Sequence, residues 1–341
     1  MTIVGTRPEI IRLSSTIKLL DQVCDHTLVH TQQNHARSLN EGIFEDLKLR
    51  KPDHAFKINE PNPMKRLGES FRFMEQLLED HPWPDAVLVL GDTNSTLVAY
   101  IAKQRGIPVF HCEAGNRCWD DRVPEEVNRR LVDHLADVNL PYGELQRTNL
   151  LREGIHPSKI WKTGSPMAEV IIAHEPPFEE SSGPPHVCVS IHRAENTKFT
   201  EWIGELLTAL HDKFPSAQII FPVHPRLDDY AHSRKLLPWI DFIEPVSPTK
   251  WWSYQRSAEI VLSDSGTLLE EAYILDFPCI NLRNSNERPE GMEGLVTVTA
   301  GTDPLKIIEN IQNTRAVGWI PEYENNKFSQ SVWNCIRSNL T

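Results

Sequence analysis

The sequence predicts an α/β protein built from two doubly wound, Rossmann-like domains. Its 341 residues and 39.0 kDa suit two domains of ordinary size better than one small core. Short apolar runs alternate with longer amphipathic segments, which is typical of parallel strands joined by crossover helices. The alternation stops at a proline-rich segment and then begins again. Ligands bind at the carboxyl ends of the strands in such sheets, so we expect the active site in the cleft between the domains.

The first half of the chain contains five apolar runs that we predict as strands. Ala86–Leu90 is the clearest of them, because it is wholly apolar and bounded by Asp85 and Gly91. The predicted strands are Thr2–Val4, Thr27–His30, Ala86–Leu90, Pro108–His111 and Val138–Leu140. Helices are expected over about Pro8–Leu20, Thr96–Arg105 and Glu125–Ala136.

The second half repeats the same alternation after a break. The segment from Glu175 to Pro185 has four prolines and no periodicity, so we place the interdomain junction there or at its edge. The strands predicted beyond it are Val187–Ile191, Gln218–Phe221, Ile260–Leu262 and Cys279–Leu282, with helices over Glu201–Phe214 and Thr267–Ile274. The expected domains are residues 1–168 and 169–325, followed by a C-terminal segment, 326–341.

Composition excludes several classes of protein. With 35 basic and 47 acidic residues the formal charge is −12, which disfavours non-specific binding to nucleic acid or anionic membranes. No apolar stretch approaches the roughly 18 residues of a membrane span, and no signal peptide is visible. The six cysteines form no Cys-x-x-Cys pair and indicate reduced thiols. We therefore expect a cytoplasmic protein. The net negative charge does not exclude a local site for a small anion.

The first predicted strand ends in a candidate anion site. In Gly5-Thr6-Arg7-Pro8-Glu9, glycine allows a tight turn, Thr6 can cap the helix and proline fits its first turn. Arg7 would then lie beside free backbone N–H groups. An ordinary turn with a solvent-facing arginine is an equally good interpretation.

Carboxylates follow the next strands. Asp92 follows Ala86–Leu90, and could simply cap the helix after it. Glu113 follows Pro108–His111, in a segment that also holds Arg117 and Glu125. These charges could form a solvated ion-pair surface. Paired carboxylates at strand ends would instead suit proton abstraction and donation, because neighbouring acids drive their pKa values apart.

In the second half, two histidines stand at predicted strand ends. His192-Arg193 and His224-Pro225-Arg226 each follow a strand, where a histidine can act as a general base or donate to a phosphate. For either histidine alone a structural role is the commoner interpretation, but two such pairs in neighbouring loops favour a site.

A phosphate-binding turn is predicted between Ile260–Leu262 and its helix. Hydroxyls, backbone N–H groups and the helix dipole converge at Ser265-Gly266-Thr267. It is not a Walker loop, because no Gly-Lys-Ser/Thr is present. Glu270-Glu271 is placed to accept hydrogen bonds from a ribose diol, although two acids on a helix surface are an alternative interpretation. Arg288 could bind phosphate or carboxylate. Metal binding is not expected: His26 and His30 do not converge on a strand.

Taken in order, these motifs resemble the non-hydrolysing UDP-N-acetylglucosamine 2-epimerase family, from Gly5 to about Glu293. Glu113-Ala-Gly-Asn-Arg-Cys118, Gly164-Ser165-Pro166 and Glu287-Arg-Pro-Glu-Gly-Met-Glu293 are most similar to a branch acting on 6-deoxy sugars. That branch inverts C2 of UDP-2-acetamido-2,6-dideoxy-L-talose to form UDP-N-acetyl-L-fucosamine.

The resemblance implies the GT-B arrangement of two domains, with a C-terminal helix, here Lys327–Asn339, that returns to the first domain. It implies a UDP-N-acetylhexosamine 2-epimerase, an isomerase that needs no metal or redox cofactor, as a homodimer. The catalytic residues it implies are Asp92, Glu113, Glu125 and His192. The residues expected to bind the UDP-sugar are Arg7, Arg12, Arg117, His224, Ser265, Gly266, Thr267, Glu271 and Arg288.

The resemblance also implies a mechanism, in which UDP leaves C1 as a carboxylate removes the C2 proton, and both then return. Three alternatives stay open. A hydrolysing epimerase would release UDP and free N-acetylmannosamine. A glycosyltransferase would need an acceptor. A nucleotide-sugar sensor would have no need of the carboxylates.

Overall fold

The computed structural model divides the chain into two compact units, which are described separately. Unit 1 comprises Met1–Ala173 and Pro321–Thr341, and unit 2 comprises His174–Ile320. The residues described are 1–32, 37–56, 58–174, 184–198, 200–224, 227, 238–283, 301–311 and 320–340. The proline-rich segment of the predicted junction lies largely outside them, at 175–183.

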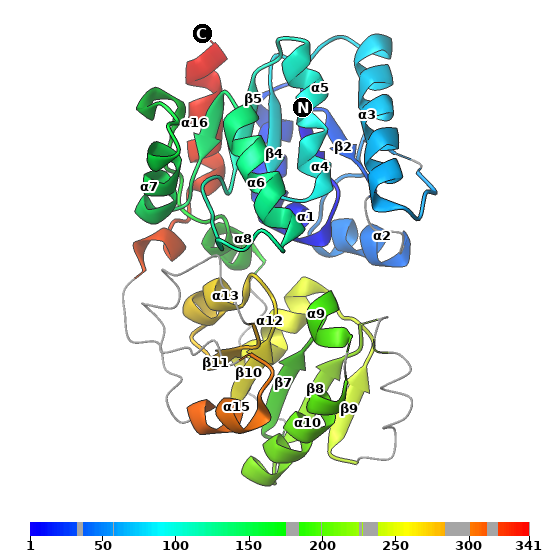
Figure 1. The fold of residues 1–341 in the computed structure, drawn as a ribbon, viewed down its shortest axis with the longest axis vertical. Coiled ribbons are helices and arrows are strands. Elements are labelled where there is room, and N and C mark those ends of the chain that lie inside the picture. The colour runs from blue at the N-terminus through cyan, green and yellow to red at the C-terminus, as the bar shows by residue number, and fades with distance from the viewer. Residues whose placement is uncertain are drawn as a thin grey trace. The chain divides into compact units, whose positions relative to one another are not determined.

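Unit 1 is built on a six-stranded parallel sheet with the order β3-β2-β1-β4-β5-β6 (Figure 1). This is the strand order of a doubly wound Rossmann fold. The strands are β1 (Thr2–Val4), β2 (Leu28–His30), β3 (His54–Ala55), β4 (Val87–Leu90), β5 (Val109–Cys112) and β6 (Val138–Leu140). The helices are α1 (Arg7–Val23), α2 (Arg37–Asp46), α3 (Pro63–Asp80), α4 (Asn94–Leu97), α5 (Ala99–Gln104), α6 (Pro124–Leu135), α7 (Glu144–Arg152), α8 (Met167–Ala173) and α16 (Phe328–Leu340).

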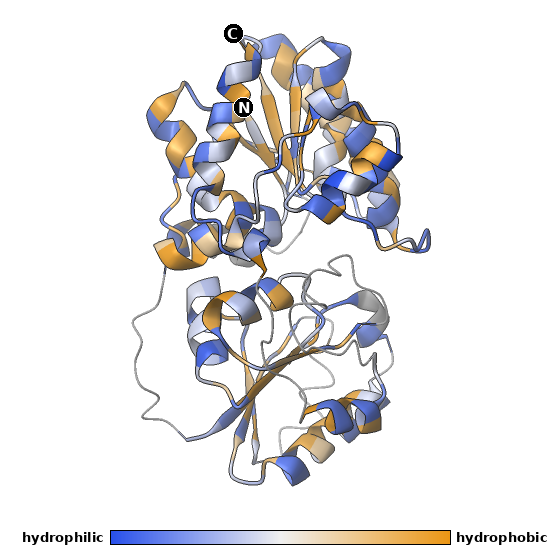
Figure 2. Ribbon diagram, turned by 90° about the vertical axis from the view of Figure 1, so that its left-hand side faces the viewer, coloured by the Kyte–Doolittle hydropathy of each residue, from blue (hydrophilic) through white to orange (hydrophobic). Residues whose placement is uncertain are grey.

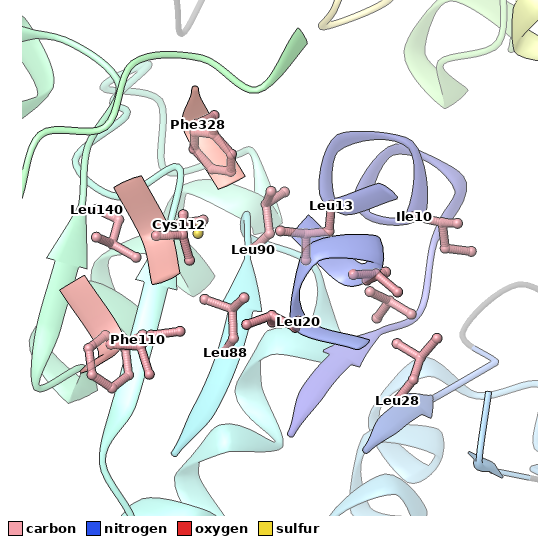
Figure 3. Packing of buried hydrophobic residues seen from close by; sticks show 14 of the residues in the cluster. Ile10, Leu13, Leu20, Leu28, Leu88, Leu90, Phe110, Cys112, Leu140 and Phe328 are labelled. Carbon is pink, nitrogen blue, oxygen red and sulfur yellow. The ribbon is translucent and has the colours of Figure 1, made fainter. Parts of the chain in front are cut away.

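The central strands of unit 1 are apolar throughout because helices cover both faces of the sheet. Leu88 and Leu90 face a cluster that includes Ile10 and Leu13 of α1 and Phe328 of α16 (Figure 3). Side chains alternate between the faces of a strand, so Val87 and Val89 enter the opposite cluster with α3, α5 and α6. The distribution of hydrophobic residues along these strands is visible in Figure 2.

Unit 2 repeats the plan on a smaller scale. Its five parallel strands have the order β11-β10-β7-β8-β9, which is again that of a Rossmann-like unit. The strands are β7 (His186–Ser190), β8 (Gln218–Pro222), β9 (Ile240–Ile243), β10 (Ile260–Ser263) and β11 (Cys279–Asn281). The helices are α9 (Ala194–Thr197), α10 (Glu201–Lys213), α12 (Pro248–Arg256), α13 (Leu268–Leu275) and α15 (Pro304–Asn310).

The prediction of two doubly wound α/β domains is therefore confirmed. Some elements differ from the sequence prediction. The helix expected at Thr96–Arg105 is divided into α4 and α5 at Val98. Helix α3 and strand β9 were missed. Only Ser70, Met74, Leu77 and Leu78 are buried on α3, so its apolar stripe is narrow. Within the described part of the chain, no helix is both long and apolar enough to span a membrane.

The C-terminal helix α16 is part of the core of unit 1. Phe328, Val332 and Cys335 are buried against the β4–β5 face, and the rings of Phe328 and Tyr142 meet edge to face at 6.0 Å. Helix α16 therefore closes one face of a sheet whose strands are distant from it in the sequence.

Replacing Phe328 by alanine should lower the free energy of unfolding of unit 1 by about 3 to 5 kcal/mol, because it leaves a cavity in this core. Urea unfolding followed by tryptophan fluorescence measures the loss. Gln330→Ala on the exposed side of α16 is the control. Equal stability of the two variants would show that α16 is not required for the unit 1 core.

Candidate active site

Each sheet has one place where the chain leaves neighbouring strands in opposite directions, and the polar motifs gather there. In unit 1 it is the carboxyl end of β1 and β4, and in unit 2 the carboxyl end of β7 and β10. Open parallel sheets bind ligands at these positions, because loops diverge there and helix N-termini point toward the gap.

The turn after β1 is held by the buried carboxylate of Glu9. Its Oε2 accepts hydrogen bonds from the Gly5 and Thr6 amides, at 2.6 and 3.2 Å, and its Oε1 accepts one from Thr93 Oγ1 at 2.5 Å. A Cβ on Gly5 would lie 1.9 Å from Ser95 Oγ, so only glycine fits this approach. Glu9 thus joins the Gly5–Arg7 turn to the residue that follows Asp92.

Asp92 is held from helix α6. Its Oδ2 accepts a hydrogen bond from Arg129 Nη2 at 2.5 Å, and its backbone carbonyl accepts one from Asn128 Nδ2 at 2.9 Å. The Asp92 side chain keeps 23% of its surface exposed, whereas Arg129 is nearly buried at 5%. The carboxylate is therefore fixed by a buried cation while one side stays accessible.

Glu113 comes off β5 beside Asp92. Strands β4 and β5 pair Leu90 with Cys112, so the residues after them emerge next to each other. A Cβ built on Gly91 would lie 3.7 Å from Glu113 Oε2. Glu113 also accepts a hydrogen bond from Asn116 at 3.2 Å and lies 3.9 Å from Arg12 Nε.

The backbone of this segment is held in unusual conformations. Glu113 has φ +66°, in the left-handed region, and Gly91 and Gly115 lie at +81° and +80°. A non-glycine residue in this region is strained and persists only where its surroundings fix it, which is common at functional sites. The conformation at Glu113 therefore directs its carboxylate with respect to the end of β4.

Two neighbouring glutamates open α6 and have different environments. Glu125 is exposed in the first turn of the helix, one turn before the residues that hold Asp92. Glu126 is buried and accepts hydrogen bonds from the Cys118 and Trp119 amides at 3.0 and 3.3 Å. Of this pair, Glu125 is the one available to a ligand.

Arg117 is enclosed by protein groups. Its side chain has no exposed surface; Nη2 lies 2.8 Å from Asp133 Oδ2, Nε donates to Glu153 at 2.7 Å and Nη1 donates to the Asn116 carbonyl. This environment departs from the sequence expectation, in which Arg117 contacts the sugar nucleotide. The reason is that Asp133 and Glu153 draw its guanidinium into the interior.

In unit 2, His192 is paired with the buried carboxylate of Asp264. His192 Nδ1 lies 2.9 Å from Asp264 Oδ1, across the carboxyl ends of β7 and β10. Asp264 also accepts from the His192 and Arg193 amides and from Asn196 Nδ2 at 3.0 Å. Burial raises the pKa of Asp264, but the pairing with His192 and these hydrogen bonds lower it by more. The pKa of Asp264 is therefore about 2. The His192 ring stays 40% exposed.

The turn before α13 has the predicted hydroxyl cluster. Ser265 Oγ lies 3.0 Å from Thr267 Oγ1 and accepts from the Thr267 amide. Thr267 donates to Glu271 at 2.7 Å, and Gln255 donates to the other oxygen of Glu271 at 2.9 Å. Burial raises the pKa of Glu271, and these donors oppose the rise. Ser265, Gly266 and Thr267 are half-buried at the N-terminus of the helix.

The remaining predicted residues are dispersed. Arg7 is half-buried at the start of α1, and Arg12 lies buried one turn later, where it donates to Tyr142 Oη at 3.4 Å. The His224 ring is 6.5 Å from that of His192. Arg288 lies outside the described residues. In unit 1 the structure brings together Asp92 and Glu113, and in unit 2 it brings together His192 and His224.

Comparison with known proteins gives the family. Residues 19–334 match the family model described as UDP-N-acetylglucosamine 2-epimerase. The chain belongs to the UDP-N-acetylglucosamine 2-epimerase family. It is 34% identical to the UDP-N-acetylglucosamine 2-epimerase of Methanococcus maripaludis, over 91% of this chain and 90% of that protein. The predicted family is thus confirmed, and with it the prediction of an isomerase.

Two further relatives bear on the ligand. The Methanocaldococcus jannaschii UDP-GlcNAc 2-epimerase, solved in complex with UDP-GlcNAc and UDP, is 31% identical and has a TM-score of 0.89, covering 99% of both chains. A Pseudomonas aeruginosa UDP-2,3-diacetamido-2,3-dideoxy-D-glucuronate 2-epimerase is 30% identical, covering 92% of this chain and 91% of that protein. Named substrates therefore differ among relatives of similar identity.

Three residues around these sites were not predicted to have a role. Glu9 was visible only as the last residue of the Gly5–Glu9 motif, Arg129 as one of several arginines near Glu125, and Asp264 as a residue between two serines. Each pairs with a residue distant in the sequence. The sequence feature that could have indicated a role for these three residues is a carboxylate or arginine inside a segment already rich in site residues.

Glu9→Gln should change the pH dependence of stability. Burial raises the pKa of Glu9 from 4.5 to about 7, so the folded chain binds this proton more tightly than the unfolded chain does. The contribution of Glu9 to stability therefore falls as pH rises through this range, by about 3 kcal/mol in total. Glutamine keeps an acceptor for Gly5 and Thr6 and donates to Thr93.

The expected result is that Glu9→Gln gains stability relative to the wild type between about pH 5 and about pH 8. Unfolding midpoints measured across this range test it, with Glu45→Gln as a control. A constant difference between Glu9→Gln and wild type would contradict the buried, proton-binding Glu9.

Proposed function

We propose that the chain is a non-hydrolysing UDP-N-acetylhexosamine 2-epimerase. The observation that carries this proposal is the pair of accessible carboxylates, Asp92 and Glu113, at adjacent strand ends, with Arg129 and Arg12 beside them. A protein that only bound a sugar nucleotide would have no need of two such acids. In unit 2, the hydroxyl turn before α13 suits a diphosphate.

The chemistry of the substrate explains why both carboxylates and a diphosphate-binding turn are needed. The proton on C2 of the pyranose has no adjacent carbonyl, so direct removal is too costly. In the proposed reaction the C1–O bond to UDP breaks as a carboxylate takes the C2 proton, which leaves a 2-acetamidoglycal with a C1–C2 double bond. UDP oxygen then re-forms the bond to C1 while a proton is delivered to the opposite face of C2.

In this proposal unit 1 supplies the carboxylates and unit 2 supplies the turn that binds the diphosphate. Asp92 and Glu113 exchange the C2 proton, and Glu125 and His192 support the transfers. Ser265, Gly266 and Thr267 bind the diphosphate, where the dipole of α13 favours negative charge on the leaving group. Glu271, already oriented by Thr267 and Gln255, accepts from the ribose hydroxyls. Arg7, His224 and Arg288 are further candidates for contacts with the UDP-sugar.

UDP-N-acetylglucosamine is the first substrate to test, since the relatives with this name match nearly the whole chain. A second candidate is UDP-2-acetamido-2,6-dideoxy-L-talose. It is favoured by the motifs Glu113–Cys118 and Glu287–Glu293, which resemble the 6-deoxy branch. Incubation with each sugar followed by anion-exchange separation distinguishes the two. The same separation detects free sugar with UDP, which would replace the non-hydrolysing proposal by the hydrolysing one.

We propose a homodimer as the working form. Val127 and Leu131, one helical turn apart on α6, are 47% and 57% exposed, and Leu145 on α7 is 41% exposed. The adjacent exposed apolar side chains of Val127 and Leu131 suit an interface with another chain. Light scattering at micromolar concentration would give the mass. We further propose a cytoplasmic location, which fits six free cysteines.

Glu113→Gln should reduce formation of the epimer by at least about 100-fold, because the amide cannot take the C2 proton. UDP affinity, measured by calorimetry, should change by less than about twofold, since the nucleotide site is in unit 2. Glu144→Gln, on the exposed start of α7, is the matched control. Wild-type turnover in folded Glu113→Gln would remove Glu113 from the proton transfers.

A further inference from the structure

A buried histidine lies beneath the two catalytic carboxylates. His111, in β5, has no exposed surface. Its Nε2 lies 2.8 Å from the Gly91 carbonyl oxygen and its Nδ1 lies 2.9 Å from Asp133 Oδ1. Both ring nitrogens therefore face oxygen atoms, one at the end of β4 and one on α6.

Nε2 shares a hydrogen bond with the Gly91 carbonyl, and Nδ1 lies at ion-pair distance from the Asp133 carboxylate without forming a hydrogen bond to it. Together these two contacts favour a proton on each nitrogen. A neutral imidazole has one N–H and one lone pair. The Gly91 carbonyl cannot donate, and Asp133 itself accepts from the Gly115 amide at 3.2 Å and pairs with Arg117 at 2.8 Å, which holds it as a carboxylate. In either neutral tautomer a lone pair would thus point at an acceptor inside the protein.

We propose that His111 is an imidazolium at neutral pH that positions the Asp92 and Glu113 segments for catalysis. Its charge is balanced within a set of four groups, three of them fully buried. Arg117 and His111 supply two positive charges, and Asp133 and Glu153 supply two negative ones. Buried charges persist when they are paired with opposite charges in this way.

The set joins the two backbone segments that direct the carboxylates. Nε2 holds the carbonyl of Gly91, at φ +81°, directly before Asp92. Through Asp133, Nδ1 is linked to the amide of Gly115, two residues after the strained Glu113. Loss of the Nε2 proton would remove this donor from the Gly91 carbonyl, and loss of the Nδ1 proton would place a lone pair against Asp133, the carboxylate that holds the Gly115 amide. His111 acts through Gly91 and Asp133, so it is a positioning residue. This catalytic role of His111 rests on the proposed function.

The groups that face His111 favour its proton. Burial lowers the pKa of His111, but Asp133, the Gly91 carbonyl and the charge of Asp92 raise it, and the net shift is upward. Arg117 and Glu153 act on it through Asp133, and His134 lies 3.8 Å from Glu153. With a raised pKa, the stabilisation by His111 is complete below the unfolded pKa of 6.5 and is lost as pH rises through the folded pKa.

The direct test is the protonation of His111 in the full chain labelled with 15N-histidine. We expect two protected N–H signals, from Nδ1 and Nε2, at neutral pH and their absence in His111→Gln. One protonated and one unprotonated nitrogen on this ring would overturn the imidazolium. The spectrum needs no substrate, so it is informative even if the epimerase activity is not found.

The activity test uses His111→Gln, with its folded state verified by circular dichroism. The control is His156→Gln, at an exposed histidine directly before the short helix Pro157–Lys159. We expect kcat of His111→Gln to fall at least about tenfold and KM to change less than about threefold, because only the carboxylates are displaced. Raising the pH should lower kcat of the wild type but not of this variant. An unchanged kcat and pH profile in folded His111→Gln would overturn the positioning role.

Discussion

The parallel pairing of β4 with β5 is the constraint on which the rest of the candidate site depends. Because Leu90 is paired with Cys112, Gly91-Asp92 and Glu113 leave the sheet side by side. Apolar side chains on both faces of these strands fix their depth in the core. Apolar packing thus sets where the two acids leave the sheet, and charged groups such as Arg129 then hold the carboxylates.

Buried acids then hold the turns that follow the strands. Glu9 accepts two backbone amides after β1, Asp133 accepts the Gly115 amide, and Asp264 accepts the amides of two residues after β7. A buried amide without a partner would cost about 1 to 3 kcal/mol, so each acid fixes its turn strongly. Both units use the same solution at the carboxyl edge of the sheet. The carboxylates and hydroxyls of the candidate site lie on turns that these buried acids hold in place.

Much of this organisation is readable from the sequence, and the reasons are physical. The apolar runs of β4 and β10 predict buried parallel strands. Parallel strands place Asp92 and Glu113 at the carboxyl edge of the first sheet and Ser265 at the carboxyl edge of the second. The side-chain pairings that hold these residues cannot be predicted from the sequence. Asp264 and the His192 amide are 72 residues apart, and Arg129 reaches Asp92 only because α6 docks beside α4. Arg117 shows the converse, since its motif predicts a ligand contact and the fold gives it buried acids.

The central claim is that carboxylates of unit 1 exchange the C2 proton of a UDP-N-acetylhexosamine during its inversion. Proton NMR of the wild-type protein with UDP-N-acetylglucosamine or the 6-deoxy-L-talo sugar in deuterated buffer tests it most directly. We expect deuterium at C2 in the inverted sugar, with UDP still attached. Inversion without deuterium would contradict solvent-exchanged proton transfer by these acids. Tight binding of both sugars with no exchange at C2 would contradict the epimerase itself.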